Sequence, residues 1–186
     1  MNPSKTGRLI GAVGVAALGV AAGLAIGGAR RAAAKAAVSL QGDWEKQLKR
    51  EHRSVRRLLK AMAETEIGEA PRRATLLAEL AETLTRHAVE EENVIYPALR
   101  SAGAGAAVKG LLADHAGMKT MIRRLEETSL EDPEWQERAK TLKALVYRHV
   151  REEERDMFPL LHESADPDAN EKLTRLVRRE AARVPG

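Results

Sequence analysis

The chain has 186 residues, of which 44% are hydrophobic, only 3% are aromatic and none is cysteine. Its apolar residues are mostly Ala, Leu and Val, which favours an all-helical fold, and the lack of cysteine excludes a disulfide framework, a zinc ribbon and a thiolate nucleophile. The net charge of +4 does not mark a basic nucleic-acid-binding domain, because residues 1–50 carry +6 and residues 51–186 carry −2.

The first element along the chain is an apolar run, residues 9–29, which contains no charged residue and follows a short tail, residues 1–8. At ~1.5 Å per residue the run just spans a hydrocarbon core of ~30 Å, so we predict a membrane-anchor helix, with a secretory signal peptide as the alternative. More basic residues follow the run than precede it, which predicts an inner or cytoplasmic membrane protein with its domain in the cytoplasm; a soluble cytoplasmic protein is the alternative. Gly19, Gly23 and Gly27 stand four apart and offer a helix–helix contact for a homo-oligomer.

A connector, residues 30–42, leads into a helical region that breakers divide into four long helices. Gly68 to Pro71 ends the first, Pro97 and residues 101–105 end the second, Asp132 and Pro133 open the fourth, and Pro159 closes it. Helices of this length with short connections pack as antiparallel neighbours, so residues 43–163 are predicted to form an up-down-up-down four-helix bundle. Residues 164–186 are predicted to add a short amphipathic helix, from about residue 170 to residue 183, and a tail.

Each predicted bundle helix carries one histidine in its apolar seam: His52, His87, His115 and His149. Glu91 and Glu153 follow the second and fourth histidines by four residues, a step that keeps both side chains on one helix face. Counting from the helix ends places the four imidazoles at one level of the bundle. A buried ionised Glu costs several kcal/mol unless it is paired, and no Lys or Arg occupies the seam near Glu91 or Glu153, so these six residues are predicted to bind metal.

An internal repeat supports a centre with two metal ions. Residues 87–99 (HAVEEENVIYPAL) and 149–161 (HVREEERDMFPLL) share a His, three Glu, an aromatic residue, a Pro and a Leu at the same offsets. His52 and His115 each follow an acidic residue and are 63 positions apart. The bundle therefore consists of two helical hairpins of the same design, and each hairpin offers two His and one Glu to the centre.

The remaining polar and aromatic residues near these motifs are interpreted more simply. Four acids are expected to face solvent or neighbouring Arg: Glu90, Glu92, Glu152 and Glu154. His162 is interpreted as a surface residue, and three aromatic residues as packing residues: Tyr96, Tyr147 and Phe158. Imidazole and carboxylate donors without thiolate suit iron, manganese or zinc, and the lack of a Glu three positions before any His excludes the ferritin-like Glu-x-x-His motif.

With these motifs, residues 43 to about 163 resemble the hemerythrin-like family of HHE cation-binding domains. The residues that carry the resemblance are His52, the pair His87 and Glu91 with Tyr96 and Pro97 after it, His115, and the pair His149 and Glu153 with Phe158 and Pro159 after it. The resemblance implies a non-haem centre of two iron ions with an oxo or hydroxo bridge, in which Glu91 and Glu153 bridge the irons and the four histidines complete the protein ligands. It also makes Glu154, five positions after His149, an alternative to Glu153.

Oxygen-carrying hemerythrins have a further His four residues after the third-helix His, where this chain has Lys119. The resemblance therefore implies an open coordination position and a centre that binds or reacts with O2, peroxide or nitric oxide in a sensing or stress-protection role. Two alternatives stay open: a catalase-like enzyme that degrades peroxide, and a membrane-anchored helical interaction protein with a structural metal. Nucleic-acid binding is not expected, since only four C-terminal arginines favour it: Arg175, Arg178, Arg179 and Arg183.

Overall fold

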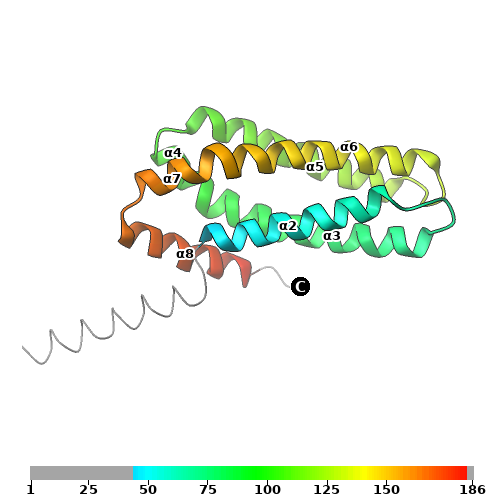
Figure 1. Cartoon of the computed structure of the whole chain (residues 1–186), viewed down its shortest axis with the longest axis horizontal. Coiled ribbons are helices and arrows are strands. Elements are labelled where there is room, and N and C mark those ends of the chain that lie inside the picture. The colour runs from blue at the N-terminus through cyan, green and yellow to red at the C-terminus, as the bar shows by residue number, and fades with distance from the viewer. Residues whose placement is uncertain (1–43, 184–186) are drawn as a thin grey trace, which may run out of the picture. The chain divides into compact units, whose positions relative to one another are not determined.

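The computed structural model describes residues 44–183, which are almost entirely helical (Figure 1). The four long helices are α2 (Trp44–Ala63), α3 (Ala70–Glu90), α5 (Gly105–Glu127) and α6 (Pro133–Glu152). Short π-helices follow α3 and α6, namely η1 (Glu91–Ile95) and η2 (Glu153–Met157), and lead into α4 (Tyr96–Ser101) and α7 (Phe158–Ser164). The last helix is α8 (Pro167–Ala181). The all-α prediction is confirmed for the described part of the chain.

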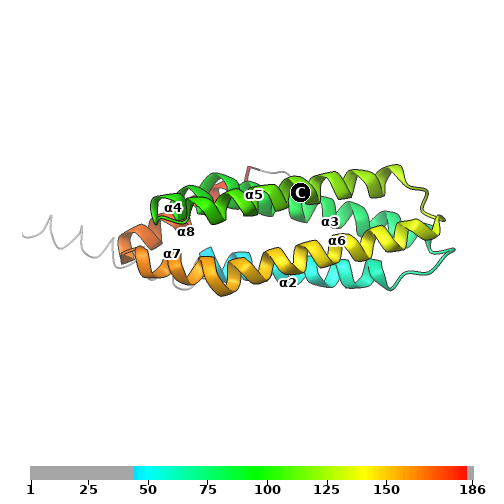
Figure 2. The same cartoon turned by 90° about the horizontal axis from the view of Figure 1, so that it is seen from above.

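The long helices form two antiparallel hairpins, α2 with α3 and α5 with α6, which lie side by side in both views of the bundle (Figures 1 and 2). Successive helices alternate in direction, as the prediction of an up-down-up-down bundle requires. The short helices α4, α7 and α8 gather at one end of the bundle, where α8 packs against α2, α3 and η1. The histidines meet nearer to this end than to the opposite one.

The sequence signals at the helix ends act through ordinary capping. The carboxylate of Asp132 accepts a hydrogen bond of 2.8 Å from the N–H of Glu134, and Pro133 occupies the first turn of α6. Asp166 caps α8 in the same way, so α8 begins at Pro167 and not near residue 170 as predicted. Gly103, with φ +91°, ends the α4 segment in the left-handed conformation that glycine adopts at little cost.

The prediction that Pro159 closes the fourth helix is wrong, because the helical path continues through α7 to Ser164. The second helical path likewise continues past Pro97, through α4 to Ser101. Both prolines lie in the first turn of an α-helix that directly follows a π-helix. Proline has no N–H to donate to a preceding carbonyl, and in both segments the turn just before it is the wider turn of a π-helix. The π-helices thus let each proline sit inside a long helical path.

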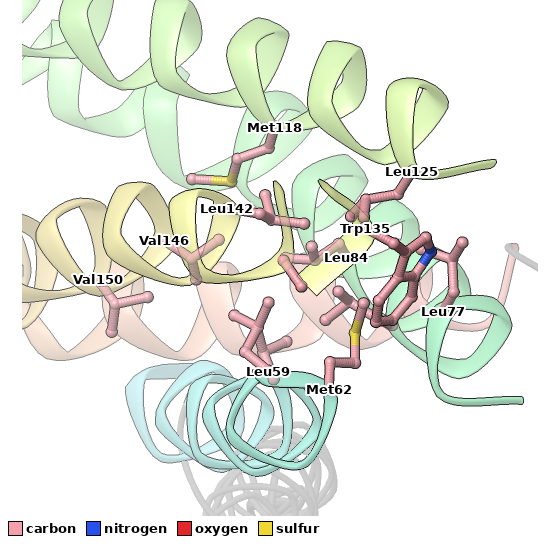
Figure 3. Close-up of a cluster of buried hydrophobic side chains, with 13 residues drawn as sticks. Leu59, Met62, Leu77, Leu84, Met118, Leu125, Trp135, Leu142, Val146 and Val150 are labelled. Carbon is pink, nitrogen blue, oxygen red and sulfur yellow. The ribbon is translucent and has the colours of Figure 1, made fainter. Parts of the chain in front are cut away.

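Two apolar cores lie along the bundle axis, and on α2 and α5 the histidine stands between a residue of one core and a residue of the other. The first core, shown in Figure 3, contains Leu59, Met62, Leu80, Trp135 and Leu142 among its members. The second core lies toward α4, α7 and α8 and contains Trp44, Leu48, Ile95, Leu99, Leu111 and Phe158. On α2, for example, Leu48 belongs to the second core and Val55 to the first, with His52 between them. The polar level is therefore enclosed by hydrophobic packing on both sides.

Among residues 44–183, no helix combines the length and the apolar character needed to cross a membrane. The predicted anchor over residues 9–29, its glycines Gly19, Gly23 and Gly27, and the connector over residues 30–42 lie outside the described residues.

Candidate metal centre

All six residues predicted to bind metal meet at one level of the bundle, and all six are buried. Their potential ligand atoms fall into two groups, each within a span of 4.8 Å: His52, His87, Glu91 and Glu153 in one, and Glu91, His115 and His149 in the other. We call the two groups the first and the second position. The α2–α3 hairpin supplies the histidines of the first position, and the α5–α6 hairpin supplies those of the second.

The first position has the dimensions of a metal site. Nε2 of His52 lies 3.0 Å from Nε2 of His87, Oε1 of Glu91 lies 3.2 Å from Nε2 of His87, and Oε2 of Glu153 lies 3.3 Å from Nε2 of His52. Two donors that each lie ~2.1 Å from one metal ion at a right angle are ~3.0 Å apart. The observed separations fit this arrangement.

The second position repeats the first with the other oxygen of each carboxylate. Nε2 of His115 lies 3.2 Å from Nε2 of His149, Oε2 of Glu91 lies 3.3 Å from His115, and Oε1 of Glu153 lies 3.4 Å from His149. Each of the two glutamates therefore turns one oxygen toward each histidine pair. This is the arrangement by which a carboxylate bridges two metal ions.

Two carboxylate oxygens at the first position have no hydrogen-bond donor among the described residues. Oε1 of Glu91 and Oε2 of Glu153 are both inaccessible to solvent, although a buried acceptor without a partner is costly. Both oxygens face the histidine pair, and a cation between these four donors would satisfy them. The donor set of imidazole nitrogen and carboxylate oxygen suits a divalent transition metal. The residues present thus fit a pair of metal ions.

The buried carboxylates and imidazoles stabilise each other's charged forms. Burial disfavours ionisation of Glu91, but the neighbouring imidazoles of His87, His115 and His52 outweigh burial and hold its pKa well below the ordinary value. Burial likewise disfavours protonation of His52, yet its contacts with Glu153, Glu154 and Glu91 raise its pKa to about 9. The site therefore keeps its carboxylates ionised and balances them with positive charge, which metal ions would supply in place of protons.

Tyr96 belongs to the centre, contrary to its interpretation as a packing residue. Its hydroxyl donates a hydrogen bond of 2.8 Å to Oε1 of Glu153 and lies 3.3 Å from Oε2 of Glu91 and 3.2 Å from Nε2 of His115. Tyr96 follows Glu91 by five residues, and η1 brings residues with this spacing onto one face. Phe158 follows Glu153 by the same five residues across η2, and its ring stacks on the imidazole of His52 at 5.9 Å.

Carboxylates also surround the outer side of the histidines. The Nδ1 atoms of three histidines lie 2.8 to 3.0 Å from a carboxylate oxygen: His52 from Glu154, His87 from Glu51, and His115 from Glu92. Such contacts fix the imidazole ring and make its other nitrogen a better metal ligand. Glu92 and Glu154 are partly exposed and Glu154 lies 3.9 Å from Arg56, as expected, but both also contact a histidine of the centre, which was not predicted. The signal for these acids lies in the repeat, where an acid precedes the first His and follows the paired Glu in each hairpin.

Two further residues differ from expectation. Glu90 is fully buried on α3, where one oxygen accepts a hydrogen bond of 2.9 Å from Gln47 and the other has no partner among the described residues. Burial, with the nearby Glu51, raises the pKa of Glu90 to about 8. His162 is half-buried: its ring stacks on Trp44 at 4.9 Å, and its Nε2 lies 2.6 Å from Glu45.

A small cavity of about 30 Å³ adjoins the four imidazoles. Its other lining residues are mostly apolar: Val55, Leu84, Thr85, Ala88, Met118, Lys119, Ile122, Val146 and Val150. A cavity of roughly 10–15 Å³ is large enough to hold one water molecule. The space beside the centre thus suits a molecule of a few atoms and excludes a larger substrate.

Comparison with known proteins agrees with this geometry. Residues 45–161 match the model of the hemerythrin HHE cation-binding domain. A crystal structure of an HHE cation-binding domain-containing protein from Mycobacterium kansasii is 28% identical, covers 77% of this chain and 85% of its own, and superimposes with a TM-score of 0.64. A DNA nickase from Nostoc sp. is 30% identical over 89 residues, which are 48% of this chain and only 25% of that protein. The chain belongs to the family of hemerythrin HHE cation-binding domains.

Proposed function

We propose that the chain binds two iron ions, and that this centre binds or reacts with a small ligand such as O2, peroxide or nitric oxide in a sensing or stress-protection role. The observation that carries the proposal is the pair of bridging carboxylates: Glu91 and Glu153 each turn one oxygen toward each histidine pair. His52 and His87 would hold the first iron, and His115 and His149 the second. Iron in such a site supplies redox chemistry and an acidic position for a ligand.

The chain's own residues set what the centre can accept. The two apolar cores exclude bulk water from the polar level, and the adjoining cavity of about 30 Å³ admits only a ligand of a few atoms. The Tyr96 hydroxyl is placed to donate a proton or a hydrogen bond beside the second position. These features support a small-molecule ligand over an organic substrate.

Metal analysis of the purified full chain tests the proposal. We expect close to two iron ions per chain, and loss of both in the Glu91→Ala variant. The matched control is His162→Ala, which removes the one described histidine outside the centre and should retain both ions. A folded wild-type chain that holds no iron after anaerobic loading with iron(II) would overturn the proposal.

An optical spectrum of the iron-loaded chain, recorded before and after each ligand is added, separates the alternatives. A change with O2, peroxide or nitric oxide supports a ligand-binding centre. Sustained oxygen evolution from peroxide, lost in Glu153→Ala, supports the catalase-like alternative. An inert spectrum combined with melting of the bundle on chelation supports a structural metal.

Membrane attachment through residues 9–29 stays part of the proposal. The run of 21 uncharged residues, flanked by basic residues, supports it. Carbonate extraction of membranes from cells that express the full chain tests it, and release of the chain into the soluble fraction counts against it.

A further inference from the structure

His149 differs from the other three histidines of the centre in its outer contact. Its Nδ1 atom lies 3.6 Å from Oδ2 of Asp114, whereas the other three Nδ1 atoms lie within 3.0 Å of a carboxylate oxygen. This Nδ1 is buried and has no hydrogen-bond partner among residues 44–183. When Nε2 of an imidazole binds metal, its Nδ1 carries the proton and needs an acceptor. His149 therefore lacks the outer support that the other histidines have.

Arg148 occupies the carboxylate that would provide this support. Its Nη2 lies 2.5 Å from Oδ1 of Asp114, and its side chain is 64% exposed while that of Asp114 is 17% exposed. Arg148 directly precedes His149 on α6, and the two side chains face different oxygens of the same acid on α5: Arg148 contacts Oδ1, and His149 faces Oδ2. The contact with Arg148 fixes the orientation of the whole carboxylate. The arginine has the short contact and the histidine has the long one.

The second histidine of this position is also affected by a surface cation. Oε1 of Glu92, which faces Nδ1 of His115 at 2.9 Å, lies 3.0 Å from Nζ of Lys119 as well. An acceptor oxygen that is shared with a cation withdraws less of the N–H proton from the imidazole, which makes the imidazole a weaker ligand.

The acids that contact the first-position histidines do not share their contacting oxygen with a Lys or Arg side chain among residues 44–183. Glu51 contacts His87 through Oε2, and among the described residues its other oxygen meets the neutral amide of Gln47 at 3.4 Å and no cation. Glu154 contacts His52 through Oε1, while its other oxygen is 3.9 Å from Arg56. Among residues 44–183, both histidines of the first position therefore keep an outer contact of 3.0 Å or less, and neither contacting oxygen is shared with a cation as that of Glu92 is.

We propose that the metal ion between His115 and His149 is the exchangeable one of the two, and that Arg148 is a positioning residue that sets its exchange rate by holding Asp114 away from His149. The proposal rests on the two-metal centre of the proposed function, and adds that the two ions are released at different rates. The first position keeps its ion, and the second position releases and reloads. Removing an exposed arginine should therefore slow metal release.

The test follows metal release from the full chain. The chain is loaded with two equivalents of cobalt(II), which resists oxidation in air, and the loss of cobalt absorption is recorded after a large excess of chelator is added. We expect a fast and a slow phase of equal size, with the fast phase missing in His149→Ala. Arg148→Gln should slow the fast phase by about tenfold, the size of effect that outer-sphere partners have on metal sites. The slow phase should not change.

Two controls separate positioning from charge. Arg138→Gln removes another arginine of α6, which pairs with Glu134 away from the centre, and should leave both phases unchanged. In an Asp114→Asn background, Arg148→Gln should have no effect, whereas a general charge effect would persist. A single release rate for both ions, or equal behaviour of Arg148→Gln and Arg138→Gln, overturns the inference while two bound ions uphold the proposed function. Fewer than two bound ions overturn both.

Discussion

The hydroxyl of Tyr96 donates a hydrogen bond of 2.8 Å to Oε1 of Glu153, across 57 residues of sequence. The same oxygen of Glu153 faces the second histidine pair, so the phenol lies among the donors of the second metal position. Burial and the two glutamates raise the pKa of Tyr96 well above its ordinary value, which keeps the hydroxyl proton in place in the metal-free chain. The Tyr96 hydroxyl thus contacts residues of both hairpins at the centre.

Tyr96→Phe should leave the fold intact, since the ring is fully buried and phenylalanine has nearly the same shape. It removes a hydrogen bond to a charged group, which contributes ~1.5–3 kcal/mol, so we expect the free energy of unfolding of the metal-free chain to fall by about that amount. The second metal ion should also bind more weakly. Urea unfolding with a chelator present and a metal titration without it measure the two effects.

Tyr147→Phe is the matched control for this prediction. Among the described residues, the Tyr147 hydroxyl donates to the backbone carbonyl of Arg56, at 3.3 Å, and to none of the six residues of the centre. It should leave metal binding unchanged. Equal metal binding by Tyr96→Phe and the parent chain would contradict a role of the phenol at the second position.

The bridging geometry predicts unequal losses from ligand variants. Glu91 serves both histidine pairs, so Glu91→Ala should reduce the metal content from two ions to near zero. His87 serves only the first position, so His87→Ala should retain close to one ion per chain. The metal content and the circular dichroism spectrum should be measured on the same samples, because the spectrum shows whether a variant that loses metal is still folded. Retention of one ion in Glu91→Ala would show that this carboxylate does not bridge.

The centre could be predicted from the sequence where it follows α-helical spacing. His87 and Glu91 are four residues apart, and on an α-helix this step turns the chain by about 400°, slightly more than one turn. The four histidines could be placed at one level because the bundle helices have similar lengths and alternate in direction. All six residues accordingly meet in the structure.

The rest of the centre escaped prediction because its spacing is not α-helical. Five residues on an α-helix turn the chain by about 500°, which would place Tyr96 about 140° away from Glu91. The π-helix η1 changes this relation and brings both side chains to the second position. Glu90 was misplaced for another reason: it contacts Gln47 of α2, and a spacing rule within one helix says nothing about contacts with another helix.

Metal affinity should rise with pH across the neutral range. Burial alone would lower the pKa of His52, but Glu153, Glu154 and Glu91 raise it to about 9, so below pH 9 a proton occupies this imidazole in the metal-free chain. A metal ion must displace that proton, and each displaced proton changes the apparent affinity by up to ~10-fold per pH unit. We therefore expect stronger cobalt binding at pH 8.5 than at pH 6.5, measured by competition with a chelator of known pH dependence.

The variant Glu154→Gln tests whether the proton on His52 causes this rise of metal affinity with pH. It removes one of the carboxylates that raise the pKa of His52, so proton competition should weaken and the slope of affinity against pH should become shallower. An affinity that is independent of pH in the parent chain would contradict the proton competition.

The buried carboxyl group of Glu90 should make the stability of the metal-free chain depend on pH. Burial raises its pKa from 4.5 to about 8, so between these values the folded chain holds a proton that the unfolded chain releases. The free energy of unfolding should therefore fall as pH rises through this window, by up to ~1.4 kcal/mol per pH unit. Glu90→Gln cannot ionise, so it should match the parent chain near pH 5 and be more stable than the parent near pH 8. Urea unfolding in the presence of a chelator, at pH 5, 6.5 and 8, measures the difference.

Glu82→Gln is the control for this effect, because Glu82 lies on the exposed side of the same helix and pairs with Arg86 at 3.5 Å. It should leave the pH slope of the parent chain unchanged. If Glu90→Gln shows the same slope as the parent, the Glu90 carboxylate does not hold its proton in the folded chain. A shallower slope in Glu90→Gln shows that the buried carboxyl of Glu90 holds a proton in the folded chain, while the slope that remains comes from groups such as His52, whose pKa is also raised.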